Sequence, residues 1–166
     1  MGDVPADFFE FAHACSGRLF RTACLLTGDW HLAEDLVQET LAKVYRSWHR
    51  IDLTGSPTAY ARTVLVRTFI SYRRRRSSSE RPVEAVPESA GPVDDPELRM
   101  ALMDALAKLT AKDRAVLVLR YWQDQSVEET AQTLRVSQGA VRVRSLRALQ
   151  KLRSVLGDDL AELARS

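Results

Sequence analysis

The sequence predicts an all-α protein with two small helical domains joined by a flexible acidic linker, the second domain containing a helix-turn-helix. Apolar residues recur with helical spacing along most of the 166 residues, and the strict alternation typical of β-strands is absent. Four prolines and six acidic residues interrupt this pattern in 77–97, a composition typical of an extended linker. We therefore expect domains at 1–76 and 98–166.

Each helix is predicted from its apolar periodicity together with signals at its ends. Gly28 suits the left-handed position after the first helix, and Pro57 suits the first turn of the third. Ser126 with Glu129 has the spacing of a capping box, and Ser137 can cap the last helix. The expected helices lie at about 5–26, 31–48, 57–76, 96–109, 111–122, 127–134 and 138–156.

The charge is distributed unevenly although the whole chain carries only +2. Residues 1–76 have a net charge of +3, residues 77–97 of −5, and residues 98–166 of +4. Two basic domains on either side of an acidic segment favour a polyanionic partner.

Composition also excludes several classes of protein. Cys15 and Cys24 would lie on opposite faces of one helix, so they cannot pair within it, and reduced cysteines indicate a cytoplasmic protein. We expect no metal site, no cofactor, no catalytic residue and no membrane insertion, because the sequence has no ligand cluster, nucleophile–base motif, phosphate loop, signal peptide or apolar run of about 20 residues.

The segment 127–156 predicts DNA binding. A short helix, a three-residue turn and a longer helix follow the plan of a helix-turn-helix. The longer helix has an apolar side that includes Val141 and Leu152, and an opposite side that includes Arg144 and Arg147. From Arg135 to Arg153 there are six basic residues and no acidic one, as a recognition helix requires.

Two further helices leave their roles open when only their residues are considered. The helix at 31–48 has a polar strip opposite its apolar side, which by itself fits a solvated face. The segment 53–79 has six arginines, no acidic residue and interleaved aromatic residues. Such a segment fits a nucleic-acid surface, but it also fits core aromatics followed by arginines at a helix C-terminus.

Three segments in this order resemble the small, two-domain, extracytoplasmic-function class of bacterial RNA polymerase sigma factors, within the sigma-70 family. AEDLVQETLAKVYRSW is similar to the family's polymerase-binding helix, and PTAYARTVLVRTFISYRRRR resembles its promoter −10 helix in the actinobacterial type. SVEETAQTLRVSQGAVRVRSLRALQKLR is similar to its −35-binding domain. The resemblance implies a non-catalytic promoter-specificity subunit that binds core RNA polymerase, recognises promoter DNA and helps to melt it, with an anti-sigma factor as an expected partner.

The resemblance also implies three sets of site residues. The residues expected to bind core polymerase are Asp35, Gln38, Glu39 and Arg46. Those expected to bind the −10 element, with a pocket for an unstacked base in the loop 50–56, are Arg50, Asp52, Arg62, Thr63, Arg67, Ser71 and Arg74. Those expected to bind the −35 element are Ser126, Gln138, Ala140, Arg142, Arg144 and Arg147.

The sequence departs from the family pattern at three positions. Two of them bear on which promoter sequence is recognised, and the third bears on the geometry of the turn. Arg67 stands where asparagine is frequent, Ser71 where aspartate is frequent, and Arg135 where glycine is common in the turn. A positive φ at Arg135 would be unfavourable by up to about 1–2 kcal/mol. The residues leave two alternative functions open: a stand-alone helix-turn-helix regulator that uses 98–166, or an adaptor without transcription activity. An enzyme is the class of protein that fits the sequence worst.

Overall fold

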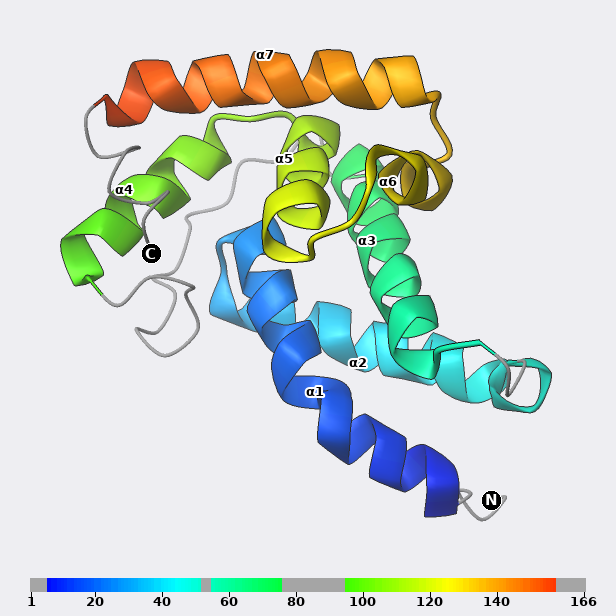
Figure 1. Ribbon diagram of the computed structural model, residues 1–166. Helices are drawn as coiled ribbons and strands as arrows, with labels where there is room; N and C mark the ends of the chain where they lie inside the picture. Colours follow the sequence, from blue (N-terminus) through cyan, green and yellow to red (C-terminus); the bar gives the residue numbers. More distant parts are fainter. Residues whose placement is uncertain (1–5, 52–54, 76–94, 158–166) are drawn as a thin grey trace.

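The computed structural model describes residues 6–51, 55–75 and 95–157, and within them every regular element is helical, which confirms the predicted all-α class (Figure 1). Helix ends lie within about two residues of the predicted ones, except that the expected helix at 111–122 is divided. The elements are α1 (Ala6–Thr27), α2 (Trp30–Arg46), the 3-10 helix η1 (Trp48–Arg50), α3 (Pro57–Arg75), α4 (Pro96–Ala107), α5 (Ala111–Leu117), the π-helix η3 (Val118–Trp122), α6 (Val127–Leu134) and α7 (Gln138–Leu156).

The first three helices pack against one another and form the first domain. Gly28 has a φ of +67° and ends α1, as predicted. Asp29 then caps α2, because its Oδ1 accepts hydrogen bonds from the backbone N–H groups of His31 and Leu32. Each helix turns an apolar face inward, and the buried residues include Leu19, Ala23, Leu26, Leu36, Val44, Leu65 and Phe69.

Helices α4 to α7 form the second domain. The predicted linker lies outside the described residues apart from 95–97, where Asp95 caps α4 through the backbone N–H groups of Glu97 and Leu98. Thr110 caps α5, and the chain then widens into the π-helix η3, closed by a bond from the Gln123 N–H to the Val118 carbonyl. No local sequence signal predicts this wider turn.

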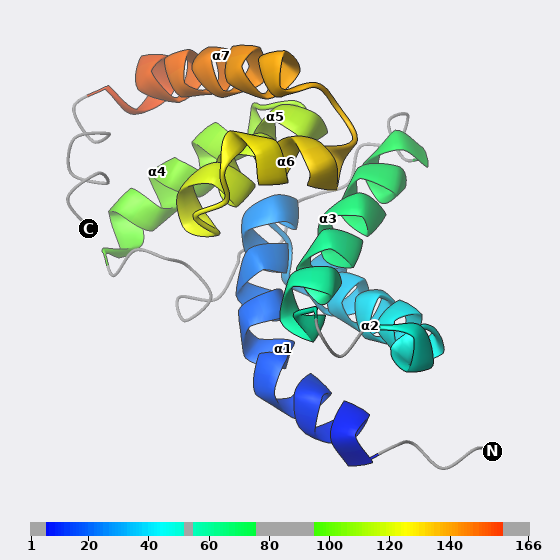
Figure 2. The same ribbon diagram turned by 45° about the vertical axis from the view of Figure 1, so that its right-hand side comes forward.

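The second domain packs directly on the first. Contacts join α5 to α1 and α3, η3 to α1, and α6 to α3. Figures 1 and 2 show the second domain above the upper end of α1 and beside α3, with α7 on the side away from the first domain. A single cluster of buried apolar side chains runs from Phe8 in the first domain to Leu156 in the second. Among the described residues, no helix combines the length and apolar character needed to cross a bilayer.

Candidate nucleic-acid and polymerase interfaces

The polar strip of α2 is exposed, as the sequence predicts. Asp35, Gln38, Glu39 and Arg46 all lie on the solvent side, opposite the buried residues of the same helix. Lys43 connects the strip to α3, because its Nζ lies 3.4 Å from Glu39 Oε1 and donates to Thr68 Oγ1 at 3.0 Å.

A hollow of about 250 Å³ adjoins this strip. Asp35 and Glu39 contribute carboxylates to its lining, whereas Leu36 from α2 and Phe69 from α3 contribute apolar surface. A partner side chain with an apolar stem and a cationic end would match both parts of this lining.

The arginine-rich face of α3 is only partly open. Ser71 and Arg74 are exposed, but Arg62, Thr63 and Arg67 are half-buried and line a cleft of about 420 Å³ beneath α6. In η1 Arg50 is exposed, and Asp52 lies outside the described residues. The −10 residues predicted from the resemblance therefore do not form one open surface in this conformation.

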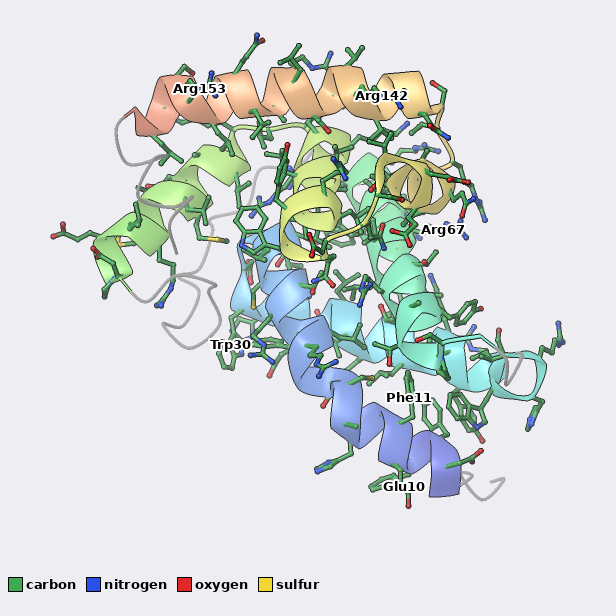
Figure 3. All side chains as sticks on the ribbon, viewed as in Figure 1. Glu10, Phe11, Trp30, Arg67, Arg142 and Arg153 are labelled. Atoms are coloured by element: carbon green, nitrogen blue, oxygen red, sulfur yellow. The ribbon has the colours of Figure 1, made fainter. Side chains whose placement is uncertain are left out.

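Arg67 contacts the second domain directly (Figure 3). Its Nε donates to the Thr133 carbonyl at 2.9 Å, and its Nη2 donates to the Gln132 carbonyl at 3.1 Å. Burial, together with the nearby Arg135, lowers the pKa of the Arg67 guanidinium. Both acceptors belong to the last turn of α6, where the negative end of the helix dipole attracts a cation.

The helix-turn-helix has the predicted geometry. Ser126 Oγ accepts from the Glu129 N–H at 3.0 Å, while Glu129 Oε2 accepts from the Ser126 N–H at 2.8 Å, so the capping box is confirmed. Arg135 takes the left-handed conformation at φ +56°, and Ser137 caps α7. Ala131 packs with Val116 and Val141, and its small side chain fits the close crossing of α6 and α7.

Two of the predicted −35 arginines are engaged within the domain. Asp113, only 4% exposed on α5, accepts from Arg144 Nη1 at 2.9 Å and from Arg147 Nε and Nη2 at 3.1 and 3.0 Å. Burial alone would raise the pKa of Asp113, but hydrogen bonds from Arg147 and Arg144 outweigh it and hold the pKa below its usual value. The carboxylate thus fixes both guanidinium groups.

The outer face of α7 presents a different set of side chains. Gln138 and Arg142 are exposed, and Arg142 lies in the half of α7 next to α6 (Figure 3). Val143 and Leu146 are each 61% exposed. The predicted site set omitted these two residues. Exposed apolar residues on a basic helix face are the signal that identifies them. Ala140 is half-buried and Ser126 serves as a cap.

Comparison with known proteins identifies both halves of the chain. The family model for Sigma-70 region 2 matches residues 11–79, and the model for Sigma-70 region 4 matches residues 105–154. The RNA polymerase sigma-E factor of Streptomyces coelicolor is 39% identical over 160 residues, which is 94% of this chain and 89% of the relative. The ECF RNA polymerase sigma factor SigL of Mycobacterium tuberculosis is 34% identical over 151 residues, covering 83% and 82% of the two chains.

The fold agrees with these sequence matches. The sigma factor RpoE of Bartonella quintana, solved in complex with the anti-sigma factor NepR, superposes with a TM-score of 0.76 at 25% identity, covering 93% of this chain and 99% of that one. The two matched regions follow the chain order in which the polymerase-binding strip, the arginine-rich helix and the helix-turn-helix occur. The chain therefore belongs to the sigma-70 family, as a sigma factor of the extracytoplasmic-function class.

Proposed function

We propose that this sigma factor attaches to core RNA polymerase through α2, reads the −10 element with α3 and the loop before it, and reads the −35 element with α7. The observation that carries the proposal is that one chain joins an exposed acidic strip on a region 2 domain to an exposed recognition helix on a region 4 domain. A stand-alone regulator would need only the second of these surfaces.

Contact with polymerase is assigned to the strip of Asp35, Gln38, Glu39 and Arg46. Its carboxylates lie beside the hollow between α2 and α3, so a basic side chain of the polymerase has both an ionic partner and an apolar floor there. This combination supports the strip as a protein interface, because ionic steering sets the orientation and apolar burial adds affinity.

Promoter contact is divided between the two domains. In the first, Arg50, Asp52, Arg62, Thr63, Arg67, Ser71 and Arg74 are proposed to bind the −10 element and an unstacked base. In the second, Gln138, Arg142 and Val143 form the exposed part of α7 that can enter a major groove, with Val143 suited to a thymine methyl group. Arg144 and Arg147, oriented by Asp113, are proposed to contact the nearby backbone phosphates.

Polymerase allows the promoter contacts of the two domains to strengthen each other. A single domain has few phosphate contacts, and its DNA affinity falls steeply with salt. Holding both domains at one spacing raises the effective concentration of the second contact once the first has formed. Capture of a flipped base then offsets an unstacking cost of a few kcal/mol, so the chain promotes melting without catalysing a reaction.

An anti-sigma factor is proposed as the regulatory partner. The likeness to RpoE, which was solved bound to NepR, extends over both domains of this chain and so includes their arrangement. Work on promoter DNA and the two free cysteines also fit a cytoplasmic location.

The proposal is tested by run-off transcription with bacterial core RNA polymerase on a genomic fragment library, with and without the chain. New, uniquely positioned transcripts that require the chain are expected, and their start sites define both promoter elements. A Gln38→Ala/Glu39→Gln variant should bind core polymerase about tenfold more weakly, equivalent to about 1.4 kcal/mol. Glu10→Gln, an exposed charge change on α1, is the matched control. Failure of the unmodified chain to bind core polymerase would overturn the proposal and favour a stand-alone regulator.

A further inference from the structure

A cleft of about 560 Å³ lies between α1, the first turns of α3 and the end of η3. Its residues on α1 recur at spacings of three and four, from Cys15 through Arg18 and Thr22 to Leu25, so they share one face of that helix. The cleft is separate from the hollow beside α2, and its size is within the range of small-molecule sites.

The lining of this cleft carries positive charge without a compensating negative charge. Arg18 and Arg21 line it from α1, and Arg62 lines it from α3, whereas no aspartate or glutamate is among the lining residues. Three like charges around one hollow repel one another and raise the local concentration of anions. An anion inside the cleft would therefore relieve the repulsion and gain from all three guanidinium groups.

These three arginines also differ from the arginines that have internal acceptors. Arg67 and Arg114 each donate to backbone carbonyls of the other domain. Within the described parts of the chain, no hydrogen bond or ion pair engages the guanidinium groups of Arg18, Arg21 and Arg62. Their donors are available to a ligand, and a guanidinium can hold a phosphate through two parallel hydrogen bonds.

The other wall of the cleft suits an aromatic ring. Trp122, at the end of η3, is half-buried and lines the cleft with its indole. Gln123 Nε2 donates to Thr22 Oγ1 at 2.8 Å, which fixes the amide and leaves its oxygen to accept from a ligand. The hydroxyl of Thr58 adds a small polar group at the start of α3. Indole surfaces stack on nucleobases, because every base has an aromatic face.

We propose that this cleft binds a purine nucleotide with two or three phosphates, which are held by Arg18, Arg21 and Arg62 while the base stacks on Trp122. Duplex DNA is the competing polyanion, but its phosphates lie on a convex surface and suit exposed helix faces. A free nucleotide fits a hollow bounded by three elements better, because its phosphates and its base need different walls. The site goes beyond the proposed polymerase and promoter contacts, with which it shares only Arg62.

Isothermal titration calorimetry of the full chain tests the phosphate contacts, with ATP, GTP and inorganic triphosphate as probes. Arg18→Gln/Arg21→Gln should weaken ATP and GTP binding at least about tenfold. Lys151→Gln/Arg153→Gln removes the same charge from α7 and is the matched control, with Arg153 at the far end of that helix (Figure 3). All four side chains are exposed, so neither double variant removes a core contact.

Tryptophan fluorescence tests the base contact. ATP or GTP should quench the emission of the unmodified chain, and Trp122→Phe should abolish most of this quenching. Trp30→Phe is the matched control, because Trp30 is also half-buried but packs on Phe20 outside the cleft. Inorganic triphosphate, which has no base, should bind about tenfold more weakly than ATP and leave the emission unchanged.

Four results would overturn the proposal. The first is absence of nucleotide binding by the unmodified chain at about 1 mM. The second is an equal loss of affinity in the two double variants, which would indicate unspecific attraction. The third is equal affinity for ATP and inorganic triphosphate. The fourth is displacement of the nucleotide by a DNA duplex whose own binding is weakened by Arg18→Gln/Arg21→Gln, which would assign the cleft to DNA. Because the titrations contain no polymerase, they are independent of the test of the proposed function.

Discussion

Replacing Asp113 with asparagine is expected to destabilise the second domain strongly. The buried carboxylate accepts three hydrogen bonds from Arg144 and Arg147, at 2.9 to 3.1 Å. Asparagine keeps the shape, and an amide oxygen in the place of Oδ1 could still accept from both arginines, but the negative charge is lost and the amide donors would face Arg147 Nε in the place of Oδ2. The lost interactions are charge-assisted and act between α5 and α7, which together form much of this domain.

The magnitude follows from the exposure of the partners. Removing one member of a fully buried ion pair destabilises by about 3–5 kcal/mol, because the other charge is left without compensation. Here the side chains of Arg144 and Arg147 are 26% and 56% exposed, so water can solvate them after the change. We therefore expect Asp113→Asn to lower the free energy of unfolding by about 2–3 kcal/mol, and Tm by about 5–10 °C for a chain of this length.

The effect should depend on pH in a defined direction. The folded pKa of Asp113 lies below the ordinary value, so the folded state releases this proton more readily than the unfolded state, whose carboxyl titrates near pH 3.9. The stabilisation is therefore complete above about pH 5 and is lost as the pH falls through the folded pKa. Consequently, the difference between Asp113→Asn and the unmodified chain should shrink between pH 7 and pH 3.

Urea unfolding followed by circular dichroism at 222 nm measures both quantities. Asp104→Asn, an exposed carboxyl on α4, is the matched control and should change stability by less than about 0.5 kcal/mol. A stability of Asp113→Asn equal to that of the control would refute the ion pair as a stabilising contact. A difference that stays constant from pH 7 to pH 3 would show that the lost stability does not come from the charge.

Three further outcomes follow from local features. Arg135→Gly should raise the free energy of unfolding by up to about 1 kcal/mol, because glycine tolerates the φ of +56°; a loss of stability would mean that the arginine side chain contributes more than the strain removes. Ser126→Ala should lower it by about 1 kcal/mol through loss of the capping box, and no change in urea unfolding would contradict that role. Cys15 and Cys24 should react with iodoacetamide at pH 8 only after unfolding, because both are buried and burial raises the pKa of Cys24 to about 12. Rapid alkylation of the native chain, detected by mass spectrometry, would contradict this prediction.

The helices could be predicted because their signals are local. Asp29, Ser126 and Ser137 each accept hydrogen bonds from backbone groups two or three residues away, so a short stretch of sequence contains the whole cap. The apolar periodicity likewise identified which faces are buried. The family pattern, in which glycine is common at this turn position, raised a positive φ at Arg135 only as a condition, and the structure gives a φ of +56° there.

The contacts between distant residues could not be predicted in the same way. Arg67 and its acceptor Thr133 are 66 residues apart, and Asp113 and Arg144 are 31 apart. Nothing near an arginine in the sequence distinguishes one that faces solvent from one that caps a helix of another domain. The sequence therefore indicated which helices are rich in arginine, but the structure was needed to find which of those arginines have internal partners.

These internal partners change what the basic charge of the chain implies for DNA affinity. The logarithm of the DNA-binding constant falls with the logarithm of the salt concentration, and each neutralised phosphate makes this slope steeper by about 0.9. A side chain contributes to the slope only if it is free to reach a phosphate. Arg67 is bound to α6 and Arg144 and Arg147 are bound to Asp113, so the free chain presents fewer available charges than its arginine-rich segments suggest. Arg67 can reach a phosphate only after it releases the carbonyls of Gln132 and Thr133. The face of α3 proposed for the −10 element therefore lacks one free charge, whereas Asp113 already fixes the arrangement of Arg144 and Arg147 on α7, the helix proposed for the −35 element.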